Sequence, residues 1–212
     1  MSTSSRSLST LDRAEGEHAP RRRSELAVYV GRIREFTRED WIVYVAWVGL
    51  MFGLVAATGG FVGVGHAGGV ALPAAAYLVP AGALVFTLAI AVDTIGHRTI
   101  YKQEIQAAEG LVHGITIFCG IGSCILLTAA YHAPGALWIP AMVLTALSFL
   151  YSLIDEVFHW RRYVSKNSDR VEMWSHVGIF VGHLTMMIAW WAWFFDGYRG
   201  VAETLVLLRG HG

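Results

Sequence analysis

Four times in this sequence, an acidic residue stands four positions before a histidine. Residues four apart lie on the same face of an α-helix, so each pair would present a carboxylate and an imidazole together. With 16 acidic residues and nine histidines in 212 positions, random placement predicts fewer than one such pair. The pairs are Asp93 with His97, Glu109 with His113, Asp155 with His159, and Glu172 with His176. This set of ligands suits a pair of transition-metal ions.

The four pairs belong to two copies of one pattern. Each copy reads Asp-x-x-x-His-x-x-x-Tyr, then a short basic stretch, then Glu-x-x-x-His. The tyrosines, Tyr101 and Tyr163, could donate hydrogen bonds to the ligands or act as redox-active phenols, and we consider them as catalytic residues. Anchoring at the membrane interface is the alternative role for both. Glu156, three residues before His159, is a further candidate ligand that could replace Asp155.

The composition indicates an integral membrane protein. Hydrophobic residues make up 55% of the chain and charged residues only 15%, against about 25% charged residues in soluble domains. The net charge is zero, so no nucleic-acid partner is expected. Cys119 and Cys124 lie in one apolar run, with a spacing that fits neither a zinc site nor a redox pair, and are expected to be small core residues.

Five apolar runs are long enough to span a bilayer. They cover approximately residues 41–64, 74–95, 108–130, 138–158 and 171–195. The remaining segments are a disordered polar tail over residues 1–24, an amphipathic surface segment over 25–40 that ends in a helix cap at Thr37, and a short outer tail over 197–212. The glycine-rich stretch Gly59–Gly69, which contains His66, is expected to form a loop.

The two copies extend over whole helical hairpins. Pro80 and Pro140 stand at similar distances before the first acid of each copy, so the repeats cover about residues 74–130 and 136–195. The predicted fold is therefore all-α and membrane-spanning, with five transmembrane helices. The duplicated two-helix hairpin forms a pseudo-twofold four-helix bundle, and the N-terminal span is extra.

Lysine and arginine residues mark the orientation. They are frequent before the first span and in the turns after the second and fourth spans, whereas residues 65–75 and 131–137 have none. The positive-inside rule then places the N-terminus in the cytoplasm, and we expect the membrane to be a bacterial inner membrane. All candidate ligands lie at one depth, near the cytoplasmic edge of the hydrocarbon.

This arrangement resembles the di-iron carboxylate proteins, in which four helices supply Glu and Glu-x-x-His ligands. Glu156-Val-Phe-His159 has that spacing, although the usual pair of such motifs is absent and histidines are more numerous. The pattern implies two transition-metal ions, with iron favoured and zinc or manganese open. The candidate metal ligands are Asp93, His97, Glu109, His113, Asp155, Glu156, His159, Glu172 and His176.

These ligands favour a membrane oxidoreductase of the oxygenase or oxidase type. It would act on a lipophilic substrate and receive electrons from a cytoplasmic donor that docks on the basic turns. A zinc hydrolase could use the same ligands. One alternative is a b-type haem protein, with His113 and His176 as axial ligands. Another is a non-catalytic metal-binding subunit of a larger membrane complex or a homo-oligomer. His183 is expected to be a hydrogen-bonded core histidine, with binding of substrate, a proton or haem as the alternatives.

Overall fold

The computed structural model describes residues 24–102, 107–166 and 170–210, and within these ranges the chain is helical and contains no strand. The side chains of residues 107–109, 162, 165 and 166 are not described. The elements are α1 (Glu25–Gly31), the short 3₁₀ helix η1 (Arg32–Glu35), α2 (Arg38–Ala67), α3 (Ala74–Thr99), α4 (Ala107–Ala129), α5 (Pro134–Lys166), α6 (Arg170–Phe195) and α7 (Val201–Gly210).

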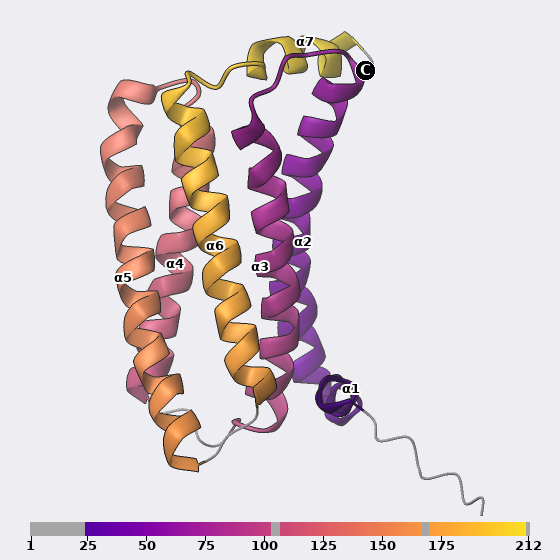
Figure 1. Ribbon diagram of the computed structural model, residues 1–212, viewed down its shortest axis with the longest axis vertical. Helices are drawn as coiled ribbons and strands as arrows, with labels where there is room; N and C mark the ends of the chain where they lie inside the picture. The colour runs from indigo at the N-terminus through magenta and orange to yellow at the C-terminus, as the bar shows by residue number, and fades with distance from the viewer. Residues whose placement is uncertain (1–23, 103–106, 167–169, 211–212) are drawn as a thin grey trace, which may run out of the picture.

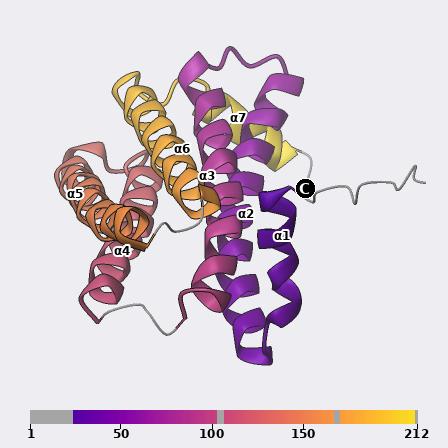
Figure 2. The same cartoon turned by 60° about the horizontal axis from the view of Figure 1, so that its bottom comes forward.

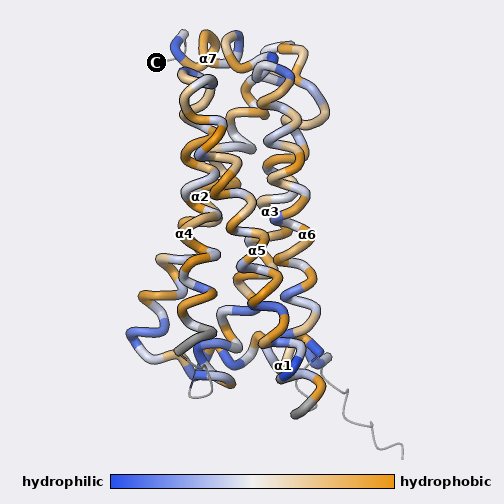
Figure 3. Tube along the Cα trace, turned by 90° about the vertical axis from the view of Figure 1, so that its left-hand side faces the viewer, coloured by the Kyte–Doolittle hydropathy of each residue, from blue (hydrophilic) through white to orange (hydrophobic). Residues whose placement is uncertain are grey.

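Five helices, α2 to α6, are long and apolar enough to cross a membrane. They run side by side along the long axis of the molecule, with α1 at one end and α7 at the other (Figure 1). Apolar residues dominate their middle sections, and polar residues gather towards the ends (Figure 3). A helix satisfies its own backbone hydrogen bonds, as lipid requires. The predicted all-helical fold with five membrane spans is confirmed at this level.

The glycine-rich stretch Gly59–Gly69 is helical for most of its length, so the expected loop is wrong. Helix α2 continues to Ala67, and only Gly68 and Gly69 belong to the turn. In an apolar environment no water competes for the peptide groups, and the usual cost of glycine in a helix is outweighed by intrahelical hydrogen bonds. His66 therefore lies on α2, with its Nδ1 atom 2.9 Å from the Tyr77 hydroxyl of α3.

The start of α2 carries the predicted cap. The Thr37 side chain accepts a hydrogen bond from the Asp40 amide, and the Asp40 carboxylate accepts one from the Thr37 amide, at 3.3 Å and 3.0 Å. The buried Asp40 carboxylate also accepts hydrogen bonds from Arg98 Nε at 2.7 Å and from Lys102 Nζ at 3.0 Å. This network fixes the start of α2 to the end of α3. We call this end of the molecule, where α1 also lies, the charged end.

The spans pack mainly as two pairs, α3 with α6 and α4 with α5, while α2 lies against α3 (Figure 2). Helices α3 and α6 meet through glycines: a Cβ atom on Gly182 would lie 2.4 Å from the Phe86 amide nitrogen, and one on Gly82 would lie 2.5 Å from the Met186 nitrogen. No described residue of α4 has its Cα atom within 8 Å of α2 or α3. The two pairs are therefore separated along one side of the bundle.

The turn between α6 and α7 closes the opposite end. Gly197, Tyr198 and Gly200 have positive φ angles of 66°, 53° and 86°, which allow the chain to reverse within a few residues. The buried Tyr198 hydroxyl donates a hydrogen bond to the Leu127 carbonyl oxygen of α4. Burial raises the pKa of Tyr198 to about 12, so its hydroxyl remains a donor at neutral pH. The contact joins the α6–α7 turn to the α4–α5 pair.

Candidate metal centre

Four histidines, one from each helix of the bundle, gather near the charged end. They are His97 on α3, His113 on α4, His159 on α5 and His176 on α6. The ring centroids of His159 and His176 are 3.7 Å apart, and His97 lies 5.6 Å from His159 and 5.7 Å from His113. Ring nitrogens of His97, His159 and His176 all lie within 4.8 Å of one another. Three helices thus direct imidazole nitrogens towards one point.

On the α3–α6 side of the cluster, Asp93 contacts two of these histidines. Its Oδ2 atom lies 3.4 Å from Nε2 of His97 on the same helix, and its Oδ1 atom lies 3.2 Å from Nε2 of His176 on α6. The Nδ1 atom of His176 is 3.0 Å from Oε1 of Glu156 on α5. Asp93 and His176 are both buried. One carboxylate thus connects two helices, and one imidazole lies between two carboxylates.

The α4–α5 side has a matching arrangement around Asp155. Its Oδ2 atom lies 3.6 Å from Nε2 of His159 on the same helix and 3.3 Å from Nδ1 of His113 on α4. The Nδ1 atom of His159 is 3.2 Å from Oε1 of Glu172 on α6, and both residues are buried. Asp155 and Glu156 therefore both contact cluster histidines, through different partners.

Two explanations of the acid–histidine pairs make different predictions. Isolated helix-surface ion pairs would join each acid to the histidine on its own helix, whereas most contacts here run between helices. The Oδ1 atom of Asp155 is buried, with no hydrogen bond among the described residues, and the Nε2 atoms of His97 and His176 lie 3.4 Å and 3.2 Å from Asp93 without the geometry of a hydrogen bond. Buried polar atoms seldom lack a partner. Carboxylate oxygens and imidazole nitrogens so arranged fit the coordination of a metal ion.

The charge balance of the cluster also bears on whether it can bind a metal ion. Within the described part of the chain, the ion pairs of Asp93, Asp155 and Glu156 are all with histidines. The guanidinium of Arg98, which lines the same cavity, is bonded to Asp40 instead. Among the described residues, compensating positive charge can come from imidazolium groups, and bound cations would also supply it. Imidazolium rings in contact repel one another in a buried site, whereas a bound cation would allow the histidines to be neutral.

The other predicted site residues differ in where they lie relative to the cluster. Glu109 belongs to α4, but its side chain lies outside the described residues. Tyr101 is buried, with its ring centroid 6.4 Å from that of His97. Tyr163 is half-buried and contacts the ring of the exposed Trp160, and no described contact joins it to the cluster. Of the two tyrosines, only Tyr101 lies beside the histidines.

A cavity of about 950 Å³ borders the cluster. It is formed mainly by α2, α3, α4 and α6, and it reaches from the histidines to His183. His183 stacks between the rings of Phe86 and Phe149, with centroid distances of 5.4 Å and 4.5 Å. His183 is buried, as expected of a core histidine, but no hydrogen bond from the described residues reaches it, and aromatic rings cover both faces of the imidazole. The sequence did carry a signal, since each phenylalanine stands about two turns before the first acid of its copy.

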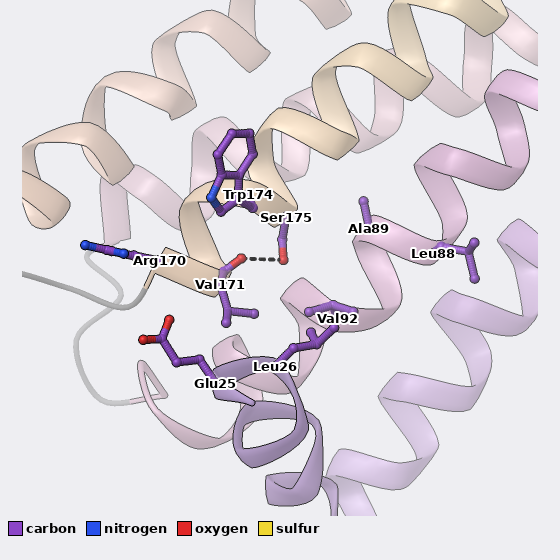
Figure 4. Close-up of a pocket in the computed structure, with 9 residues that line it drawn as sticks. All are labelled: Glu25, Leu26, Leu88, Ala89, Val92, Arg170, Val171, Trp174 and Ser175. Atoms are coloured by element: carbon purple, nitrogen blue, oxygen red, sulfur yellow. Dashed lines mark hydrogen bonds between the residues drawn. The ribbon is translucent and has the colours of Figure 1, made fainter. Parts of the chain in front are cut away.

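A second, smaller pocket of about 580 Å³ lies between α1, α3 and α6 at the charged end (Figure 4). Leu26, Val92 and Trp174 line it, together with Glu25 and Arg170. None of the candidate metal ligands lines this pocket. Of these two pockets, only the larger one is lined by described residues of the acid–histidine pairs.

No protein-family model, curated protein or solved structure matches this chain. Function must therefore be inferred from the histidine cluster and from the cavity that it borders. Both features combine residues from all four helices of the bundle, so they depend on the assembled fold.

Proposed function

We propose that this protein is a membrane metalloprotein that binds two transition-metal ions at the histidine cluster. The observation that carries the proposal is the approach of three imidazole nitrogens, from three helices, to within 4.8 Å of one another. Ligands of one ion lie about 2.0–2.2 Å from it, so nitrogens and oxygens at such separations need only small adjustments to share a cation. The buried Oδ1 atom of Asp155, which lacks a hydrogen bond among the described residues, supports the same assignment.

The metal identity follows from the ligand types. Carboxylates and imidazoles without thiolates suit iron, manganese or zinc, and we favour iron. The ligands are the four histidines together with Asp93, Asp155, Glu156, Glu172 and Glu109. Four or more carboxylates would balance the charge of two divalent ions in a site of low dielectric constant, which lowers the cost of burying all these groups.

The proposed bundle is a duplicated hairpin with pseudo-twofold symmetry, and α2 is the extra span. Two matched contacts support this symmetry, because the 3.2 Å pair between His176 and Asp93 corresponds to the 3.3 Å pair between His113 and Asp155. The pairing of α3 with α6 likewise corresponds to that of α5 with α4.

The symmetry also predicts equivalent roles for Glu109 and Glu172. Replacing either one with Gln should lower the metal content per chain to a similar degree. A loss in one variant, with full metal content in the other, would contradict the duplication.

The most consistent activity is that of an oxidoreductase acting on a lipophilic substrate. When bound, the metal pair supplies the redox chemistry. The chain holds the imidazoles in place through the inter-helix carboxylates, and Tyr101 packs beside His97 at the edge of the cluster. The N-terminus faces the cytoplasm of a bacterial inner membrane, and an electron donor docks on the basic turns at that face. Assembly into a larger membrane complex or a homo-oligomer is compatible with this role.

Metal analysis of the purified protein tests the proposal. We expect about two iron, zinc or manganese ions per chain by mass spectrometry, and at least tenfold less in a His113→Ala, His176→Ala double variant. The exposed His132 provides a control, because His132→Ala should retain all its metal. Full metal content in the double variant, or a Soret band in the optical spectrum that indicates haem, would refute the assignment.

A further inference from the structure

The cavity beside the cluster contains a further polar side chain, that of His183, at the end away from the cluster. We propose that it binds an uncharged, chain-like lipophilic molecule whose single hydroxyl or carbonyl oxygen is hydrogen-bonded by His183. That this molecule is the substrate rests on the proposed function, whereas its binding does not require metal. Three features carry the inference: the state of His183, the lining of the cavity and the position of its opening.

His183 is a buried polar group whose ring faces are covered but whose nitrogens are not used. Its exposure is 5%, and Phe86 and Phe149 stack on it at 5.4 Å and 4.5 Å. No hydrogen bond or ion pair from the described residues reaches its nitrogens, and the residue lines the cavity. Because nearly all buried polar groups in proteins are paired, a molecule in the cavity is the natural partner. The two phenyl rings hold the imidazole in one orientation for that bond.

The cavity walls between His183 and the cluster are mainly apolar. They include Trp47, Ile90, Ile117, Ile121 and Met186. A volume of about 950 Å³ is typical of sites for small organic ligands, which commonly combine apolar walls with a few polar groups. No carboxylate or unpaired cation of the described residues lines the half that surrounds His183. An uncharged ligand with a single polar group therefore matches this surface.

The opening of the cavity faces the lipid. Helix α4 does not approach α2 or α3 within the described residues, so the cavity is least enclosed on that side. Val43, Leu50 and Ile125 line the cavity and are also exposed at the protein surface, at 43%, 52% and 61%. All three belong to membrane spans. A molecule dissolved in the bilayer can therefore enter sideways between α2 and α4 without crossing water.

The spacing along α6 defines the size of the ligand. His183 follows His176 by seven residues, which is about 10 Å along the axis of an α-helix. A small polar solute bound at His183 would not reach the cluster. A molecule whose oxygen is held at His183, and whose alkyl chain extends towards His176, spans both ends of the cavity. This selects long-chain alcohols, aldehydes or ketones as the ligand class.

Two photoreactive probes test the inference on the purified full-length protein in lipid nanodiscs. One is dodecan-1-ol with a diazirine in the chain, and the other is the matching dodecane. Both should label Ile121, Cys124 and Met186 saturably, as mapped by peptide mass spectrometry. A His183→Phe variant keeps the stacking but loses the hydrogen bond, so it should bind the alcohol about three- to tenfold more weakly. Its affinity for the alkane should be unchanged.

Two tryptophan variants separate cavity binding from general lipid contact. Ile121→Trp fills the cavity and should reduce the saturable labelling by both probes at least fivefold. Ile188→Trp adds the same ring at a position of α6 that is 60% exposed, so it should change neither probe. Labelling that never saturates, or that Ile121→Trp leaves unchanged, would overturn the inference. So would equal loss of alcohol and alkane binding in His183→Phe.

Metal content measured on the same samples distinguishes this inference from the proposed function. Saturable alcohol binding by protein that takes up no metal would refute the metal site and retain the ligand site. Full metal content without saturable labelling would refute the ligand site and retain the metal site.

Discussion

Substitution of Gly182 tests the closest approach between two spans. A Cβ atom at this position would lie 2.4 Å from the Phe86 amide nitrogen and 2.9 Å from the Gly82 carbonyl oxygen. Both atoms belong to the backbone of α3, so no side-chain rotation can relieve the contact. Ordinary contacts begin at 3.4 Å, and Gly182→Ala must therefore move α6 away from α3 by about 1 Å.

The cost of that movement can be estimated from packing and from the cluster. Overpacking of a well-packed interface costs about 1–3 kcal/mol, and we expect Gly182→Ala to lower the free energy of unfolding by about 2 kcal/mol. The same displacement would lengthen the 3.2 Å contact between His176 and Asp93, since these residues lie on the same two helices. An ion held by both would be bound more weakly, and we expect at least a tenfold loss of affinity.

A double-mutant cycle makes the prediction specific. Gly82→Ala affects the same interface between α3 and α6, because its Cβ atom would lie 2.5 Å from the Met186 nitrogen. One separation of the helices relieves both clashes, so the double variant should cost clearly less than the sum of the single variants. Independent sites would give additive costs.

Denaturant unfolding in detergent, followed by tryptophan fluorescence, measures these costs, and metal analysis measures the effect on the cluster. Gly60→Ala is the matched control, since a Cβ atom on this exposed glycine of α2 would meet no neighbouring atom within 4 Å. It should be neutral, or stabilising by up to about 1 kcal/mol, because alanine is the better helix former. If Gly182→Ala behaves like Gly60→Ala in both measurements, α3 and α6 are not in backbone contact.

Two further predictions concern the ends of the bundle. Asp40→Asn removes the negative charge that Arg98 and Lys102 share, and should lower the free energy of unfolding by about 1–2 kcal/mol in denaturant titrations at low salt; an unchanged midpoint would show that the network contributes nothing. Tyr198→Phe removes the hydrogen bond to Leu127 and should cost about 1 kcal/mol at pH 8. Because burial raises the pKa of Tyr198 to about 12, unfolding releases its proton between pH 10 and 12, and the wild-type free energy of unfolding should fall over that range. The Phe variant should lack this component of the fall, and equal slopes in the two proteins would contradict the burial of the hydroxyl.

The five spans could be predicted from sequence because each needs about 20 apolar residues and little else. Their ends could not. Helix α5 continues to Lys166, well past its apolar run, because intrahelical hydrogen bonds extend a helix beyond the hydrocarbon wherever no residue stops it. The different ends of α3 and α5 also explain why Tyr101 and Tyr163 lie in different surroundings. The chain leaves α3 at Thr99, and the Tyr101 amide bonds back to the Gly96 carbonyl oxygen at 3.0 Å, whereas Tyr163 remains within α5, where its ring contacts Trp160.

Spacing predicted which residues share a helix face, and therefore the contact of Asp93 with His97. It could not predict that Asp93 also contacts His176, or that His159 contacts Glu172. Those contacts depend on which helices are neighbours and on how each is rotated, and this information lies in packing features such as Gly182. The stacking of His183 has the same origin, because its two phenylalanines come from different helices.

The pairing of α3 with α6 has a consequence for how the protein is made. Synthesis runs from the N-terminus, so α3 enters the bilayer with the acid and histidine of its last turn while α6 has not yet been translated. Helices α4 and α5, joined by a short turn, can meet as soon as both have left the ribosome. Helix α6, which packs against α3, is made after the other four described spans. A nascent chain arrested after α5 should therefore hold a formed α4–α5 hairpin beside an α2–α3 pair in which Asp93 lacks its α6 partner, His176, a state that quality-control proteases of the membrane are suited to recognise.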